Sequence, residues 1–147
     1  MRFNSTKVSA PRFYSKYLRL TVVPFQEGKI KLNGEWIDAT ITYDEDGFVY
    51  IFTTERFNKI FSVVSRRTPT DISVPLLSLE SLKDSPLYIH SKSGGYYRLY
   101  NGTMAYVIED DVAKVSKIYI STNDGAIYAR LNDDFRSGFT DTLDVNK

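Results

Sequence analysis

Cysteine is absent from this chain of 147 residues. Without it the protein has no disulfides, no thiolate nucleophile and no thiolate ligands for zinc or an iron–sulfur cluster. Nothing in the composition points to an oxidising compartment, and we therefore expect a cytoplasmic protein.

Histidine is almost as scarce, because His90 is the single one in the sequence. A histidine-based nucleophilic site needs a base beside a nucleophile and a partner behind that base, and it would have to use this residue. No such motif accompanies His90, which stands in an apolar run. We expect a structural or surface role for it, and the sequence favours a protein that is not an enzyme.

Phosphate-binding glycine motifs and long apolar runs are also missing. The sequence has no Walker A motif and no Gly-x-Gly-x-x-Gly run, and no apolar stretch approaches the roughly 18 residues that span a bilayer. Residues 1–10 lack the apolar core of a secretory signal. Acidic clusters at 44–47 and 109–111, and Asp124 with 133–134, are typical of turns, so we expect no metal, cofactor or membrane contact.

Aromatic residues, by contrast, are abundant. Eleven Tyr and nine Phe bring the aromatic share to 14%. Aromatic and β-branched residues favour half-buried strands, so the composition predicts a mainly β protein, either all-β or α+β. With 42% hydrophobic and 25% charged residues, a chain of this length is expected to fold as one compact unit.

The dipeptide Asn33-Gly34 gives the clearest local prediction. Both residues suit the positive φ angles of a type I′ two-residue turn, which pairs the run 29–32 with the run 35–43. The alternation along these strands places Trp36 on the face opposite the core. A hairpin is therefore expected here, with the apolar run 48–53 as a further strand of the same meander.

A short helix is expected after this meander. The apolar period changes from two to that of a helical stripe at Phe57, Ile60, Phe61 and Val64, and Thr54 is a suitable N-cap. Beyond the helix, Leu87 to Ser91, Tyr96 to Tyr100 and Met104 to Ile108 read as strands, and a last hairpin crosses residues 122–125.

These patterns divide the chain into four segments around a polar joint at residues 65–71, where we expect a boundary between two lobes. No stretch repeats another at a fixed period, so the lobes are expected to share only their β character. The segments are a basic N-terminal arm (1–16), a β-meander with a helix (17–83), a small barrel-like β module (84–139) and a polar tail (140–147).

One group of residues in the C-terminal third carries a resemblance. The group consists of an opening Tyr-Arg-x-Tyr-x-Gly and a close of Tyr-x-Arg followed by Phe; its members are Tyr97, Arg98, Tyr100, Gly102, Tyr128, Arg130 and Phe135. This pattern resembles a small bacterial and phage β domain of unknown function. The resemblance implies a compact barrel-like module and no established activity.

Charge is unevenly distributed along the chain. Residues 1–31 hold seven basic residues and one acidic residue, a net +6, so the remaining 116 residues carry −5. Aromatic residues lie among these bases. The candidate binding residues that follow are Arg12, Tyr14, Lys16, Tyr17 and Arg19.

Three functions are open at this point. The favoured one is a non-enzymatic binding protein, a phage or mobile-element accessory or counter-defence inhibitor that acts on a host macromolecule, most simply a host protein. The second is a nucleic-acid binder that uses the basic aromatic N-terminal region, since such a mixture grips phosphates and stacks on bases. The third is a small enzyme or a nucleotide-sequestering protein. Partner identity and oligomeric state do not follow from the sequence.

Overall fold

The structure is a computed structural model that describes residues 5–44, 46–64 and 70–145. Its elements form two consecutive sets. The first is β1 (Ser5–Ala10), β2 (Phe13–Ser15), β3 (Leu20–Leu32), β4 (Glu35–Asp44), β5 (Val49–Thr53), α1 (Thr54–Ile60) and β6 (Ser62–Val63). The second is β7 (Thr70–Pro75), β8 (Leu87–His90), β9 (Tyr96–Leu99), β10 (Ala105–Glu109), β11 (Val112–Ser121), β12 (Ile127–Leu131), α2 (Asn132–Gly138), β13 (Phe139–Asp141) and α3 (Thr142–Val145).

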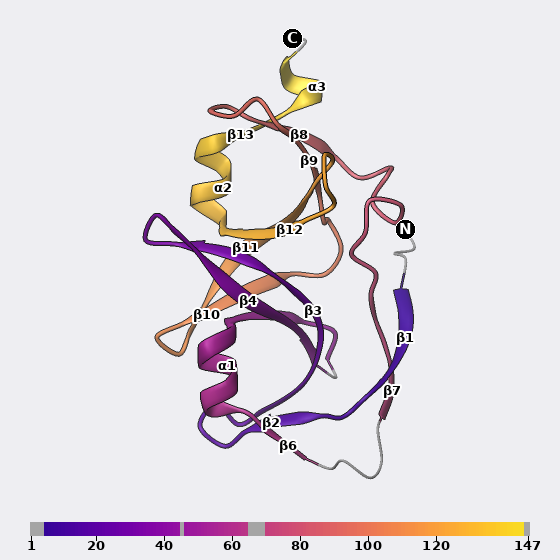
Figure 1. The fold of residues 1–147 in the computed structure, drawn as a ribbon, viewed down its shortest axis with the longest axis vertical. Coiled ribbons are helices and arrows are strands. Elements are labelled where there is room, and N and C mark those ends of the chain that lie inside the picture. Colours follow the sequence, from indigo (N-terminus) through magenta and orange to yellow (C-terminus); the bar gives the residue numbers. More distant parts are fainter. Residues whose placement is uncertain (1–4, 45, 65–69, 146–147) are drawn as a thin grey trace.

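Six of these strands close into a barrel. Their hydrogen-bonding order is β3, β4, β5, β10, β11 and β12, and β12 pairs back onto β3. Each consecutive trio is an antiparallel meander, and the two meanders meet in parallel at β5–β10 and at β12–β3. The fold is therefore mainly β, as the composition predicts, and it contains a meander, a short helix and a barrel (Figure 1). The barrel, however, takes three strands from residues 17–83 and three from 84–139, whereas the sequence placed it in the second segment alone.

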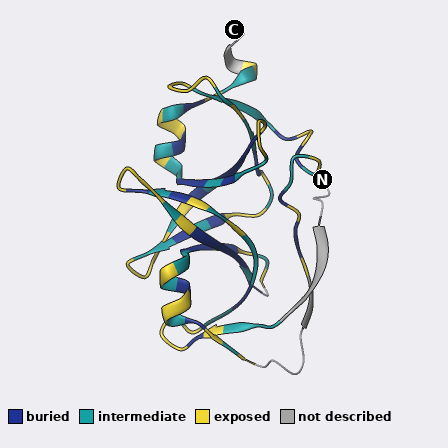
Figure 2. Ribbon diagram, viewed as in Figure 1, coloured by how far each residue is buried: buried dark blue, intermediate teal, exposed yellow. Residues whose placement is uncertain are grey.

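The barrel interior holds the largest apolar core. Buried residues from all six strands make up this core, and Figure 2 shows the buried stretches along the crossing strands. At the β12–β3 seam the backbones approach so closely that a Cβ on Gly28 would lie 2.8 Å from the carbonyl oxygen of Ile127. Glycine is the residue that fits this close approach.

The two meanders are copies of one unit. β4 pairs with β5 in the same register as β11 with β12, and β2 pairs with β6 as β8 does with β13. Each meander is followed by a short helix. In Figure 1 both helices lie along the left edge, α2 above the barrel strands and α1 below them. The expectation that the halves share only their β character is therefore wrong.

An uneven offset hides this repeat from a search at fixed period. Equivalent positions are 75 residues apart at Val22 and Tyr97, 77 apart at Gly28 and Ala105, and 78 apart further on. The continuous strand β3 corresponds to β9 and β10 together, with residues 100–104 between them. The residues that do match include the aromatic pairs Tyr50/Tyr128, Phe57/Phe135 and Phe61/Phe139.

The hairpin at Asn33-Gly34 is confirmed. Leu32 pairs with Glu35 and Ile30 with Ile37, and the two turn residues have φ angles of 52° and 79°. The predicted helix is also present, but it begins one residue earlier than expected, because the side chain of Thr53, not Thr54, accepts the bond from the backbone N–H of Arg56. The expected strands near residues 87–91, 96–100 and 104–108 are β8, β9 and β10.

The ends of the chain are partly ordered into strands and a helical turn. Residues 5–10 form β1, which pairs with β7 in a two-stranded antiparallel ribbon. Residues 140 and 141 belong to β13, and residues 142–145 form α3. Residues 1–4, 146–147 and positions 65–69 of the predicted joint lie outside the described residues. In the part of the chain that is described, no helix has both the length and the apolar character needed to cross a bilayer.

Candidate functional site

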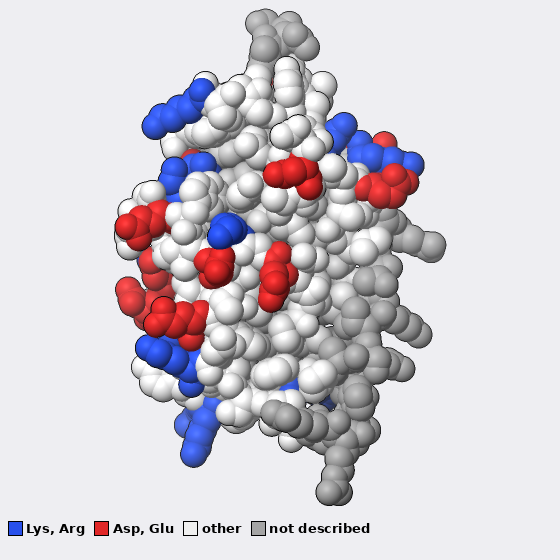
Figure 3. All heavy atoms as spheres, in the orientation of Figure 1, with Lys and Arg blue, Asp and Glu red and all other residues white. Residues whose placement is uncertain are grey.

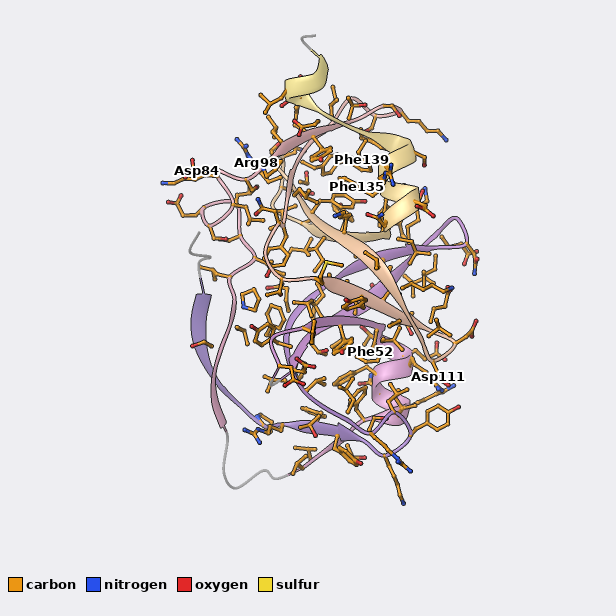
Figure 4. The ribbon with its side chains drawn as sticks, turned by 180° about the vertical axis from the view of Figure 1, so that it is seen from behind. Phe52, Asp84, Arg98, Asp111, Phe135 and Phe139 are labelled. Atoms are coloured by element: carbon orange, nitrogen blue, oxygen red, sulfur yellow. The ribbon has the colours of Figure 1, made fainter. Side chains whose placement is uncertain are left out.

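Each helix covers a satellite core on the outer face of the barrel. Under α1 the cluster is apolar: fully buried Phe52 contacts Phe57 and Phe61, whose rings stack 4.6 Å apart. Under α2, Phe135 and Phe139 stack in the same way at 4.4 Å. Figure 4 shows Phe52 beside α1 and the Phe135–Phe139 pair beside α2. The two clusters are thus equivalent parts of the repeat.

The cluster under α2 contains a cation where the cluster under α1 contains a phenyl ring. Arg130 occupies the position equivalent to Phe52, since each pairs with the matching residue of its meander. Arg130 is nevertheless only 6% exposed. A buried charge is costly unless it is paired or used, and an arginine at this position is therefore the first sign of a functional site.

The substitution extends along a row of neighbouring residues. In one half of the molecule the row across three adjacent strands consists of Phe52, Ile108 and Ala113. In the other half the equivalent row is Arg130, Lys31 and Trp36. The second row therefore has two cations and an indole where the first row is apolar. We call the region around Arg130, Lys31 and Trp36 the Arg130 site.

Arg130 is held by aromatic groups and one hydrogen bond. Its Nε donates to the hydroxyl oxygen of Tyr119 at 2.7 Å, and its guanidinium lies 5.1 Å from the Trp36 ring and 5.2 Å from the Phe139 ring. Nη1 is 3.4 Å from both carboxylate oxygens of Asp134, a long contact. Within the described part of the chain, Nη2 makes no hydrogen bond. The guanidinium is therefore held in place, and its Nη2 hydrogens remain available to a ligand.

Tyr119 orients the guanidinium and adds no charge of its own. The ring is almost completely buried, and this burial raises the pKa of its hydroxyl far above the ordinary value of 10.0. Tyr119 therefore stays neutral at any physiological pH, and its oxygen accepts from Arg130. The positive charge of Arg130 is not cancelled by this contact.

A cavity of about 200 Å³ opens at this position. It is smaller than the roughly 300–1,000 Å³ typical of pockets for drug-sized ligands, so it suits one group of a ligand. Trp36 at its rim is 41% exposed. The lining residues are Trp36, His90, Ser93, Tyr97, Tyr119, Tyr128, Arg130 and Phe139.

The electrostatic balance of the cavity is positive. Burial lowers the pKa of His90, and the charges of Arg130, Lys31 and Lys92 lower it further against a smaller opposite effect of Asp134. His90 is therefore neutral near pH 7, and its neighbours comprise three cations and one carboxylate. This arrangement favours an anion.

His90 also forms a hydrogen bond with Ser93, whose Oγ lies 2.9 Å from Nδ1. The backbone N–H of Ser93 approaches the same nitrogen at 3.4 Å, so the contact closes the turn after β8. In the described residues no side chain hydrogen-bonds Nε2. Those residues likewise contain no group of three His, Asp or Glu side chains that could hold a metal ion.

The sequence-predicted binding residues lie elsewhere. They lie on β2 and in the segments that flank it, near α1 (Figure 1). None of them lines the cavity; they are Arg12, Tyr14, Lys16, Tyr17 and Arg19. Lys29 and Lys31, from the same basic stretch, lie further along β3, where they pair with Tyr128 and Arg130 of β12. The fold thus splits the +6 segment into two places, and both signs of charge are interspersed on the face shown in Figure 3.

Tyr17 is the predicted residue with the most defined surroundings. Its ring lies 5.4 Å from the guanidinium of Arg56, and a hydrogen bond with Asp111 raises the pKa of its hydroxyl. Arg56 in turn donates to Asp111 at 3.1 Å. This exposed trio links the β2–β3 turn to the β10–β11 turn.

Sequence reasoning assigned no binding role to the Arg130 site, although the resemblance pattern includes Tyr97, Tyr128, Arg130 and Phe135, which meet there. The signal was present in the repeated spacing of Tyr, Phe and Phe around positions 50–61 and 128–139, which marks Phe52 and Arg130 as equivalents. No protein-family model, curated protein or solved structure matches the chain.

Proposed function

We propose that this chain is a non-enzymatic binding protein whose ligand presents an anionic group to Arg130. The observation that carries the proposal is the exchange of a buried Phe for a buried Arg between two equivalent satellite cores. Phe52 demonstrates that an apolar residue can fill this position in this fold. Retention of a cation at the second position is then explained by a ligand.

The composition of the site supports an anion in particular. Arginine binds phosphate and carboxylate through paired N–H donors, and a partly dehydrated guanidinium does so more strongly than an exposed one. The contact between Asp134 and Nη1 is long, so an incoming oxyanion can replace it. Lys31, whose Nζ lies 5.8 Å from the Trp36 ring, adds positive charge at the rim.

A nucleotide-sequestering protein is the form of this proposal that the sequence already suggested. A host protein as the partner, and a phage or mobile-element origin, stay predictions. So does nucleic-acid binding through Arg12, Lys16 and Arg19, for which the exposed turn around Tyr17 is the surface.

Isothermal titration calorimetry with inorganic phosphate tests the anion site. We expect the parent to bind phosphate, Arg130→Met to lose at least roughly tenfold in affinity, the scale of one charge-assisted hydrogen bond, and Arg130→Lys to lose less. The matched control is Arg56→Met, because Arg56 also lies over an aromatic ring and contacts an aspartate but does not line the cavity. Equal phosphate binding by the parent and Arg130→Met would refute the proposal.

A further inference from the structure

The Arg130 site combines cations with flat aromatic walls, and this combination narrows the class of ligand. We infer that, if the proposed anion site is correct, its ligand is a nucleotide: a phosphate monoester held at Arg130, with a flat ring packed against the aromatic rim around Trp36.

The charge count favours a phosphate over a carboxylate. Arg130 lines the cavity, and the Nζ of Lys31 lies 5.8 Å from the Trp36 ring at the rim. A phosphate monoester carries about −1.5 to −2 near pH 7, so a phosphate that replaces the long Asp134 contact matches both cations. A carboxylate carries a single charge and matches only one of them.

The size of the cavity places the two parts of such a ligand. A cavity of about 200 Å³ takes one group, and its deepest cation is Arg130. The remainder of the ligand must lie over the rim, where Trp36 keeps 41% of its surface exposed. Tyr128 meets Trp36 edge-on at a centroid distance of 5.1 Å and so braces the indole in position.

Aromatic walls of this kind bind ligand rings by stacking. Base–aromatic stacking contributes without reading the hydrogen-bonding edges of a base, because every base has a π-face. The cavity lining includes His90 and Ser93 beside its aromatic walls, but at the exposed rim Trp36 and Tyr128 offer ring faces to a base. We therefore expect purine and pyrimidine nucleotides to bind with similar affinity.

Trp36 is the only tryptophan of the chain, which makes it a reporter specific to this site. The experiment compares four probes by calorimetry and by Trp36 fluorescence: inorganic phosphate, adenosine, AMP and UMP. We expect AMP and UMP to bind at least roughly tenfold more tightly than phosphate and adenosine, with a change in Trp36 emission. Trp36→Leu should reduce that difference, whereas Trp36→Phe should keep most of it.

Each alternative outcome has a distinct meaning. Phosphate and AMP binding equally, with unchanged Trp36 emission, overturns the nucleotide and leaves the anion site standing. Adenosine binding as tightly as AMP overturns the phosphate at Arg130. Binding of none of the four probes removes the proposed function as well.

A single-stranded oligonucleotide separates a free nucleotide from a nucleic acid. Tighter binding than AMP, with an affinity that falls steeply with salt, would assign the site to a strand of nucleic acid and overturn the inference. Arg130→Met serves as the control in every arm, and circular dichroism verifies that each variant is folded.

Discussion

Exchanging the residues at the two equivalent positions tests whether Arg130 is retained for a ligand or for stability. Arg130→Phe gives the second satellite core the residue that the first one has, and Phe52→Arg does the reverse. If Arg130 serves a ligand, the fold should tolerate the first change and not the second. The two variants therefore have opposite expected effects on the free energy of unfolding.

The magnitudes follow from the contacts of each residue. Arg130→Phe loses the bond to Tyr119, about 1.5–3 kcal/mol for a hydrogen bond to a charged group, and gains about 1.5–3 kcal/mol from a buried ring. Asp134 is 42% exposed at its side chain and remains hydrated when its partner is removed. The net change should stay within about 2 kcal/mol of zero, since buried ion pairs are often replaced by apolar residues without loss.

Phe52→Arg is expected to be far more costly. Phe52 is completely buried among aromatic rings, and truncation of such a residue alone costs about 3–5 kcal/mol. An arginine there would also be a charge without a hydrogen-bond partner. Phe52→Leu is the matched control, with an expected loss of about 1.5 kcal/mol or less.

Urea denaturation followed by circular dichroism measures these differences, with the slope of each curve as a check that the unfolded state is unchanged. We expect Arg130→Phe to be at least about 2 kcal/mol more stable than Phe52→Arg. A loss of more than about 3 kcal/mol in Arg130→Phe would refute the reasoning, because Arg130 would then be needed to hold its half together.

Three further predictions concern the barrel seam, His90 and the N-terminal basic residues. Gly28→Ala should destabilise the protein by about 1–3 kcal/mol through the clash at the Ile127 carbonyl. Ala105→Gly at the equivalent seam should cost only about 0.5–1 kcal/mol. Similar losses from both variants in urea denaturation would argue against the close approach. The pKa of His90 is lowered on folding, so the unfolded state binds more protons just below pH 6.5; stability should therefore fall as the pH drops through that window, and His90→Gln should flatten the fall unless His90 is not the group responsible. If the surface around Tyr17 binds duplex DNA, the logarithm of affinity should fall by about 0.9 per phosphate contact for each unit of log salt, and changing Arg12, Lys16 and Arg19 to Ala should flatten this slope; an unchanged slope excludes the surface.

Local features of the fold could be predicted because they depend on neighbouring residues. Asn33-Gly34 specifies its own turn, and the helical stripe at Phe57 and Phe61 specifies a short helix. The N-cap was misplaced by one residue because Thr53 and Thr54 are chemically interchangeable as caps.

Barrel closure and the Arg130 site were beyond such patterns because they depend on long-range pairing. The seam between β12 and β3 joins residues about 100 positions apart, and only Gly28 hints at it. The site assembles Arg130, Lys31 and Trp36 from three strands, and its two cations are about 100 residues apart in sequence. Charge counting selected the N-terminal segment as a unit, whereas the fold divides it between β2 with its flanking turns and the far part of β3.

Nuclear magnetic resonance of the Arg130 side chain during a phosphate titration tests the anion site most directly. The Nε–H of Arg130 is buried and hydrogen-bonded to Tyr119, so its proton should exchange slowly enough to give a signal. We expect this signal to shift and saturate along with the indole N–H of Trp36, while the backbone amide signal of Arg56 stays unchanged. An Arg130 signal that does not move while phosphate shifts signals elsewhere would contradict the assignment of the site.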